Sequence, residues 1–363
     1  MPASDDLQVR FLADGDQSAE SVAEQLTAFM GPATQSLDIA VYDCGLSGNA
    51  ASIVSGALAH CAARGVAIRL AYFSGERASR TVPPPAGGSA SFAGSIHGET
   101  KAITGFQALM HQKYVIRDRL GPGAAVWTGS TNWTVDSWTR EENVIVIASS
   151  APLAGLYGID FDQLWASGEV GDTGRVSAGQ LEIRCGGRPA STRVWFPPWA
   201  GVELAEAVGS AIRGATRRIA VASPVLTDGP ILGALRDVVS SRTVPVRGVF
   251  DATQMDEVFH QWSQEGVAAW KMDAFRAVAD AAGMAGKRST PYGPNSTHDF
   301  MHLKAIVVDD VVFTGSYNFS RSGEENAENV LAVECADLAG TVVDFIDRLI
   351  QRYGTPGATA VPA

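Results

Sequence analysis

The sequence has few charged side chains for its length, and the basic ones are outnumbered. Of its 363 residues, 18% are charged, and the formal net charge is -11 at pH 7. A surface with this balance does not attract polyanions through its overall charge. A nucleic-acid ligand would need a locally basic groove, and the sequence contains no basic stripe. A lipid headgroup or a small phosphodiester makes no such demand.

Long apolar runs and closely spaced cysteines are also lacking. No run of about 18 apolar residues occurs, so we expect no membrane-spanning helix. Residues 1–10 are polar and acidic, unlike a secretory signal. The four cysteines, without Cys-x-x-Cys spacing, are too sparse for a disulfide scaffold, so we expect buried free thiols and a cytoplasmic protein, or a secreted protein if a signal has been removed. They are Cys44, Cys61, Cys185 and Cys335.

What the sequence does contain is a large apolar fraction, 46%, arranged in alternating patterns. A chain of this length and composition suggests two domains or one double-lobed unit. Helices are predicted at 18–30 and 50–64, between strands at 7–12, 37–42 and 66–73. This alternation of strands and helices predicts an α/β fold with helices flanking a mixed sheet.

The same order of elements recurs in the second half. Strands are predicted at 193–196, 218–223 and 244–251, with helices at 201–214 and 231–241 between them. A repeat of roughly 180–190 residues indicates a duplicated domain. We therefore expect an N-terminal lobe at 1–175 and a C-terminal lobe at 190–363, joined by a linker at 176–189.

The two halves differ after their third strands. Residues 74–105, with three consecutive prolines at 83–85, are predicted to be loop without a packed element, forming a rim or lid of a site. Residues 252–300 instead carry apolar side chains at helical spacing. Such a stripe is mostly core, and the alternative is that some of its aromatic residues line a substrate cleft.

A short motif occurs once in each half: His-x-Lys, four residues, Asp, and then Gly-Ser-x-Asn. Each copy is followed by a Glu-Asn pair. The first copy comprises His111, Lys113, Asp118, Ser130, Asn132 and Glu142-Asn143. The second comprises His302, Lys304, Asp309, Ser316, Asn318 and Glu328-Asn329.

The spacing within the motif indicates which side chains act together. Side chains at i and i+2 of a strand share a face, so histidine and lysine point the same way. Asp118 and Asp309 fall beyond the strand and are predicted to be structural. The Gly-Ser-x-Asn segment follows the next strand, where its serine and asparagine supply short hydrogen-bond donors. Ser130, Asn132, Ser316 and Asn318 are thus predicted to bind phosphate.

Two histidines and two lysines suit attack on a phosphodiester. One imidazole can attack phosphorus and form a phosphohistidine, while the other protonates the leaving oxygen. Lysines and polar donors can hold the charge on the phosphoryl oxygens. Glu142 and Glu328 are the predicted carboxylates that orient the imidazoles. This chemistry needs no metal and no cofactor.

A zinc site is the alternative for one pair of histidines. His298 and His302 are four residues apart, which on a helix would suit two metal ligands. The His-Glu-x-x-His pattern is absent, and His302 is predicted to begin a strand. The sequence therefore predicts no metal site.

The duplicated motif resembles the signature of the phospholipase D superfamily, over nearly the whole chain. The resemblance implies two similar α/β lobes related by a pseudo-twofold axis, with the active site at their interface. It also implies a two-step phosphohistidine mechanism, with His111 as nucleophile and His302 as acid. The connection from Asp118 to Gly129 is five residues longer than that from Asp309 to Gly315, which affects only the hairpin.

The substrate class remains open among three possibilities within the superfamily. The segments Asn132-Trp133-Thr134 and Asn318-Phe319-Ser320 resemble those of its nucleases, which favours a nuclease-like phosphodiesterase acting on DNA or RNA. The alternative is hydrolysis or transphosphatidylation of phospholipids, as in phospholipase D. A third possibility is an inactive binding protein of the same fold. We expect no stable membrane insertion, and a monomer suffices because one chain holds both motifs.

Overall fold

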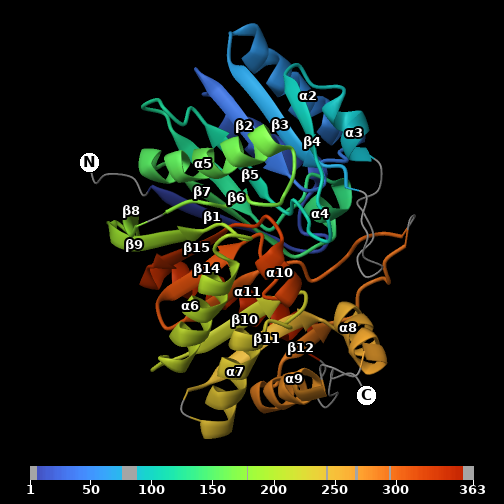
Figure 1. Cartoon of the computed structure of the whole chain (residues 1–363), viewed down its shortest axis with the longest axis vertical. Coiled ribbons are helices and arrows are strands. Elements are labelled where there is room, and N and C mark those ends of the chain that lie inside the picture. Colours follow the sequence, from blue (N-terminus) through green and yellow to red (C-terminus); the bar gives the residue numbers. More distant parts are fainter. Residues whose placement is uncertain are drawn as a thin grey trace.

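The chain forms two α/β lobes, each built around one mixed sheet (Figure 1). The computed structural model describes residues 6–75, 88–177, 179–242, 244–265, 269–293 and 296–354. In Figure 1 the N-terminal elements, blue to green, occupy the upper half, and the yellow to red C-terminal elements occupy the lower half. The predicted α/β fold with two similar lobes is therefore confirmed.

The first lobe contains a seven-stranded sheet in the order β1-β7-β6-β5-β2-β3-β4. Strands β2, β3 and β4 are parallel, and the remaining neighbours are antiparallel. The strands are β1 (Leu7–Leu12), β2 (Ser36–Val41), β3 (Ala67–Phe73), β4 (Glu99–Ile103), β5 (Lys113–Arg117), β6 (Ala125–Gly129) and β7 (Asn143–Ala148). The helices are α1 (Ala19–Met30), α2 (Gly48–Ala63), α3 (Gly88–Ala93), α4 (Val135–Thr139) and α5 (Ala151–Ser167).

The second lobe repeats this sheet and adds one strand at its edge. Its order is β12-β11-β10-β13-β14-β15-β9-β8, in which β9 to β15 correspond to the seven strands of the first lobe. The strands are β8 (Leu181–Cys185), β9 (Arg188–Trp195), β10 (Ile219–Ser223), β11 (Val246–Asp251), β12 (Ala285–Lys287), β13 (Ala305–Val308), β14 (Val311–Gly315) and β15 (Val330–Glu334). The helices are α6 (Gly201–Arg213), α7 (Gly229–Ser241), α8 (Ala252–Glu265), α9 (Ala269–Ala282), α10 (Arg321–Glu325) and α11 (Ala336–Tyr353).

One hydrophobic core runs through the interface of the two lobes. Met110 and Tyr157 of the first lobe belong to the same buried cluster as Leu331 and Ile346 of the second. Phe345 of α11 also stacks on Phe11 of β1, with ring centroids 4.2 Å apart. Burial of apolar surface stabilises this contact by roughly 25 cal/mol per Å². The lobes are thus held in one orientation, which fixes the geometry of any site between them.

The segment predicted to be loop before the first motif contains two packed elements. Helix α3 lies at 88–93, and β4 pairs in parallel with β3 at the sheet edge. Neither element has a recognisable apolar pattern in the sequence. Helix α3 consists mostly of small residues, and β4 has mainly polar side chains, which an edge strand tolerates. The prolines at 83–85 lie outside the described residues.

The corresponding insertion of the second half forms α8, α9 and β12. Met255, Phe259, Phe275 and Val278 are buried in the core of this lobe, so most of the apolar stripe is core, as predicted. Trp270 is the exception, with 45% of its surface exposed. Residues 181–185, within the expected linker, form β8, which makes a hairpin with β9.

Two of the four cysteines are joined, which corrects the prediction of free thiols throughout. Cys185 at the end of β8 forms a disulfide with Cys335 at the start of α11, and their Cα atoms are 6.3 Å apart. Only Cys44 and Cys61 are free and buried. The pairing escaped prediction because the two cysteines are separated by 150 residues and meet only through the tertiary fold. No helix in the described ranges is both long and apolar enough to span a bilayer.

Candidate active site

Both histidine motifs lie at the lobe interface, where the chain enters a central strand. His111 precedes β5 in an extended segment whose backbone pairs with the other lobe: the His111 N–H donates to the Ala327 carbonyl at 2.8 Å. The Lys113 ammonium donates to the His111 carbonyl at 2.8 Å. In the second copy, Lys304 donates to the His302 carbonyl at 2.9 Å. The lysines thus lie behind the histidines and are themselves buried.

A cavity of about 270 Å³ brings the two copies together. His111 and His302 both line it, as do Asn132 and Asn318 of the Gly-Ser-x-Asn segments. The packing of the two lobes therefore brings together two histidines that are far apart in the sequence. This is the arrangement expected for one site with two imidazoles.

His111 is held by a carboxylate from the opposite lobe. Its Nδ1 lies 2.8 and 2.9 Å from the two carboxylate oxygens of Glu328. Burial raises the pKa of Glu328 to about 8, against the opposing effects of Lys113 and Ser316. A proton therefore stays between Nδ1 and this carboxyl group at neutral pH. With Nδ1 engaged, Nε2 is the ring nitrogen that would act on a ligand.

His302 is held by an amide rather than by a carboxylate alone. Its Nδ1 lies 3.0 Å from the Asn143 side-chain oxygen and 3.3 Å from a carboxylate oxygen of Glu141. Burial, together with Lys304 and Lys113, lowers the pKa of His302 well below 6.5. The free site therefore holds a neutral imidazole here, which donates its Nδ1 proton to the amide oxygen.

The pairing of the strands explains this difference between the histidines. Gly129 lies opposite Ile145 in the β6–β7 pair, and Gly315 lies opposite Val330 in the β14–β15 pair. Counting two residues back from each partner gives Asn143 and Glu328, which therefore occupy equivalent positions. The Glu-Asn pair of the first half is displaced by one residue, so Asn143 stands where the second half has its glutamate.

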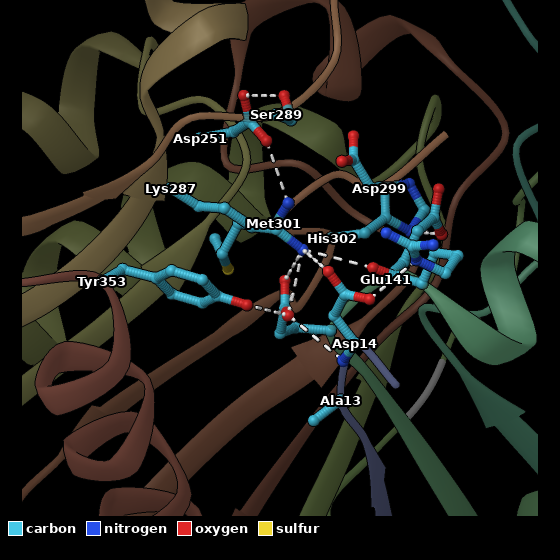
Figure 2. Close-up of polar contacts among 12 residues, drawn as sticks. Ala13, Asp14, Glu141, Asp251, Lys287, Ser289, Asp299, Met301, His302 and Tyr353 are labelled. Atoms are coloured by element: carbon cyan, nitrogen blue, oxygen red, sulfur yellow. Dashed lines mark hydrogen bonds and ion pairs between the residues drawn. The ribbon is translucent and has the colours of Figure 1, made fainter. Parts of the chain in front are cut away.

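Glu142, predicted to orient an imidazole, lies instead in a separate buried cluster. Its carboxylate accepts hydrogen bonds from the Lys287 ammonium at 2.9 and 3.1 Å and from the Asp14 N–H at 3.3 Å. The Tyr353 hydroxyl donates to it as well. Figure 2 shows Lys287, Tyr353 and Asp14 converging on this point. Adjacent side chains of a strand point to opposite faces, so a displacement of one residue directs Glu142 into this contact between the lobes.

Glu141 and Asn143 are the site residues that sequence reasoning missed. The Glu141 carboxylate also accepts from the Ser137 hydroxyl at 2.7 Å and from the Asn143 amide at 3.1 Å. Burial raises the pKa of Glu141 to about 7. In the sequence, the one indication of this role is that Glu141 lies two residues before Asn143. That indication can be used only once the register of the strands is known.

The serines and asparagines of Gly-Ser-x-Asn differ in where they point. The Ser130 hydroxyl donates to Asn143 at 2.6 Å, and that of Ser316 donates to Glu328 at 2.5 Å. Both serines are fully buried behind the imidazole-orienting groups, contrary to a direct phosphate contact. By contrast, Asn132 and Asn318 line the cavity, and the side-chain oxygen of each is buried without a hydrogen-bond donor in the described chain. The side-chain amide N–H groups are the atoms of these residues that can donate to a phosphate.

The motif aspartates lie away from the cavity. Asp118 accepts backbone N–H bonds from Thr34, Gln35 and Ser36 at 2.9, 2.7 and 3.0 Å. Asp309 makes the equivalent bonds to residues 216–218. Burial alone would raise the pKa of Asp118, but these bonds together lower it. Both residues have positive φ, 47° and 53°, which aspartate tolerates better than most residues.

The lysines behind the imidazoles supply the positive charge of the site. Burial lowers the pKa of Lys113 to about 7, although Glu328, Glu141 and Asp43 raise it. The pKa of Lys304 is likewise lowered by burial and by Lys113. An entering phosphate anion would favour the charged form of both ammonium groups. The site is thus electrostatically suited to an anion held directly at the histidines.

Comparison with protein families identifies the repeat. The profile described as "Cardiolipin synthase, PLD-like domain" matches this chain twice, at residues 26–165 and 208–350. A comparison with curated protein sequences finds no match.

Solved structures share the fold at low sequence identity. Phosphatidylserine synthase of Haemophilus influenzae Rd KW20 is 11% identical, with a TM-score of 0.63, covering 95% of this chain and 86% of that one. Polyphosphate kinase of Porphyromonas gingivalis is 12% identical, with a TM-score of 0.56, covering 95% of this chain and 47% of that one. Nuc of Salmonella typhimurium, a phospholipase D family member, is 22% identical, with a TM-score of 0.34, and covers 46% of this chain and 97% of its own.

Proposed function

The chain belongs to the phospholipase D superfamily, with two phospholipase D-like domains, and from that membership we propose that it cleaves a phospholipid-type phosphodiester through a phosphohistidine. One observation carries the proposal. His111 and His302 line the same cavity, and each imidazole is anchored through Nδ1 by a group of the opposite lobe. With Nδ1 of both rings engaged, Nε2 is the nitrogen of each ring that would act on the substrate.

The reaction proceeds in two displacements at phosphorus. In the first, Nε2 of His111 attacks phosphorus, the P–N bond forms, and the P–O bond to the leaving alcohol breaks as His302 protonates that oxygen. In the second, His302 takes a proton from water or an acceptor alcohol, whose oxygen attacks phosphorus and breaks the P–N bond. The product is a phosphatidate or a new diester.

The unequal partners of the histidines support this division of roles. Phosphorylated His111 carries a positive charge, which the adjacent Glu328 carboxyl group stabilises. Burial and the cations behind His302 keep its pKa low in the free site, and a phosphate anion counters the effect of those cations. His302 therefore takes up the proton that it delivers to the leaving group when the substrate binds.

The character of the cavity supports a phospholipid rather than a nucleic acid. Its lining includes the carboxylates of Asp43, Glu141 and Glu257, and no lysine or arginine is among its described lining residues. A polyanionic strand would be repelled by such a wall. The family description and the likeness over 95% of the chain to a phosphatidylserine synthase point the same way.

The nuclease-like expectation depended on the residues after Gly-Ser-x-Asn, and their placement weakens it. Trp133 is 2% exposed, and Phe319 is completely buried. Their side chains pack in the cores of the lobes, so the aromatic residue after each asparagine reflects packing rather than substrate.

The disulfide supports a location outside the cytoplasm, in place of the cytoplasmic expectation. Structural disulfides persist in oxidising compartments and are rare where thioredoxin and glutathione keep thiols reduced. The Cys185–Cys335 bridge joins two elements of the fold, as a structural disulfide does.

Loss of either histidine tests the chemistry. His111→Asn and His302→Asn should each reduce hydrolysis of bis(p-nitrophenyl) phosphate by at least about 10³-fold. His60→Asn, on the exposed side of α2, serves as the matched control. Activity should survive EDTA, since the lysines supply the positive charge. Full activity of either active-site variant would contradict the mechanism. Loss of wild-type activity on chelation would contradict it as well.

A direct comparison of substrates tests the substrate class. The wild-type protein should release the headgroup from phospholipid vesicles and leave single-stranded DNA and RNA intact. Cleavage of nucleic acid with unchanged lipid would reverse this assignment.

A further inference from the structure

One wall of the catalytic cavity carries aromatic rings and carboxylates, and none of the described residues that line the cavity is a lysine or an arginine. Tyr42, Tyr292, Phe300, Asp43 and Glu257 line it together with the histidines. Phosphate chemistry does not explain these residues, because an anionic substrate gains nothing from carboxylates. They indicate a second, positively charged part of the ligand.

The aromatic part of this wall is an ordered stack. The His298 ring stacks on Tyr292 with centroids 4.8 Å apart and on Phe300 with centroids 5.4 Å apart. The backbone N–H of His298 donates to the Asp136 carboxylate at 2.9 Å, which holds the segment around His298 against the first lobe. Tyr42 meets His111 edge to face at 4.9 Å. Aromatic rings attract cations, and one of these rings, Tyr42, lies directly beside the catalytic imidazole.

Asp43 is the carboxylate at the centre of the wall. The Ser89 hydroxyl and the Gly45 N–H donate to it at 2.9 and 3.0 Å, and both bonds end on Oδ1. Oδ2 is thus the oxygen left to meet a ligand. Burial raises the pKa of Asp43, while Ser89, Gly45 and the nearby His298 oppose that rise. A bound cation would stabilise the ionised carboxylate.

Glu257 adds a second negative charge from α8. Its side chain is exposed to solvent at the mouth of the cavity, and partial burial raises its pKa. Asp43 from the first lobe and Glu257 from the second therefore place negative charge on a shared cavity.

Two further residues place the phosphoryl group relative to this wall. Asn132 and Asn318 of the catalytic motifs line the same cavity. Their side-chain amides can donate hydrogen bonds to a phosphoryl oxygen. Asp43 follows Tyr42, which touches His111, so the charged wall begins one residue from the catalytic imidazole.

We propose that Asp43, Glu257 and the Tyr292–His298–Phe300 stack form a subsite for a primary ammonium group on the alcohol half of the diester. The inference rests on the proposed function and narrows its substrate to aminoalcohol phosphodiesters. A primary ammonium donates hydrogen bonds that the Asp43 Oδ2 can accept, whereas a quaternary ammonium has none to donate. A neutral alcohol would bring no positive charge to the Asp43 carboxylate.

Short-chain lipids below their micellar concentration test the subsite. We expect kcat/KM to fall in the order dihexanoyl-phosphatidylethanolamine, -phosphatidylcholine, -phosphatidylglycerol, with about tenfold between the first and the last, as one charge-assisted hydrogen bond would give. Asp43→Asn keeps an oxygen for Ser89 and Gly45 and should bring the ethanolamine-to-glycerol ratio close to one. Asp172→Asn, at an aspartate whose side chain is 90% exposed, should leave that ratio at its wild-type value.

Bis(p-nitrophenyl) phosphate, which has no ammonium group, distinguishes a failure of the ammonium subsite from a failure of the proposed phosphodiesterase activity. Equal rates on the ethanolamine and glycerol lipids, with the aryl diester cleaved, would overturn the subsite alone. Preference for choline over ethanolamine would overturn the assignment to a primary ammonium. A wild-type protein that cleaves neither the aryl diester nor any lipid would contradict the proposed function itself.

Discussion

Asn143 makes the two halves of the site chemically unequal. It occupies the position of Glu328 but offers an amide oxygen to its histidine, while Glu141 approaches the same nitrogen at 3.3 Å. An amide stabilises an imidazolium less than a carboxylate does. The duplicated motif therefore supplies two imidazoles with different proton affinities, which is what a nucleophile and an acid require.

Restoring the carboxylate should change the acid–base behaviour of His302. Asn143→Glu places a negative charge against Nδ1, so the pKa of His302 should rise, by about one unit or more. Because His302 must be protonated for the first displacement, the limb on which kcat/KM falls with rising pH should move to higher pH by the same amount, and an NMR titration of His302 would measure the shift directly. Asn49→Glu, at an exposed position of α2, is the control. An unchanged profile would show that Asn143 does not set the pKa of His302.

Lys113 predicts an alkaline limit to activity. Its pKa is lowered to about 7, so the free site loses this ammonium as the pH rises through about 7. The neutral amine no longer stabilises the phosphoryl charge, and kcat/KM should fall above that pH. Lys113→Arg keeps its charge throughout, so whatever activity remains should lack this limb. A wild-type profile that stays flat to pH 9 would contradict the assignment.

At the level of elements, the motif aspartates secure the ends of the central strands. Each carboxylate closes the turn after β5 or β13 by binding three consecutive backbone N–H groups of the segment entering β2 or β10. The spacing of the motif thus serves two purposes. Histidine faces the cavity at one end of the strand, with the lysine buried behind it, and aspartate holds the neighbouring strand at the other end.

Removing one aspartate should reduce stability and leave the chemistry intact. Asp118→Asn should lower the free energy of unfolding by about 2 kcal/mol, the size expected for hydrogen bonds to a buried charge. Since the pKa of Asp118 in the folded chain lies below 3.8, this contribution is present at neutral pH and is lost only as the pH falls below that value. Asp309→Asn, at a more exposed residue, should cost less.

Urea unfolding with parallel measurement of kcat checks this prediction. Asp237→Asn, on an exposed face of α7, is the control. A large loss of kcat in folded Asp118→Asn would mean that the aspartate acts in the site.

At the level of the whole molecule, the site exists only when both lobes are in place. Glu328 of the second lobe orients His111, and Asn143 of the first orients His302. The shared apolar core and the buried Lys287–Glu142 pair hold the lobes together. Separating the lobes would leave each histidine without its partner.

The disulfide contributes to the stability of this assembly. It ties the β8–β9 hairpin to the start of α11 across 150 residues, a long loop whose closure restricts the unfolded chain. Cys335→Ser should therefore lower the free energy of unfolding by about 4 kcal/mol. Reductant should lower the Tm of the wild type but not that of the variant. Titration of unfolded, unreduced wild-type protein should find two free thiols; four would contradict the bridge.

Periodicity and the motif suffice to predict the fold class, the duplicated lobes and the pairing of each histidine with a lysine. They also place Asp118 and Asp309 beyond their strands. These features follow from local geometry, because side chains alternate along a strand and repeat about every 3.6 residues along a helix. Helix α3 and strand β4 escape prediction because neither carries a clear apolar pattern.

The sequence by itself determines the chemistry of this protein: two imidazoles, two ammonium groups and the amides that accompany them. Only the tertiary structure decides how they are partnered. A displacement of one residue in strand register directs Glu142 to Lys287 and puts Asn143 at His302, and two cysteines 150 residues apart become a disulfide. Strand register and long-range proximity are properties of the packed sheets, and no local pattern of residues encodes them.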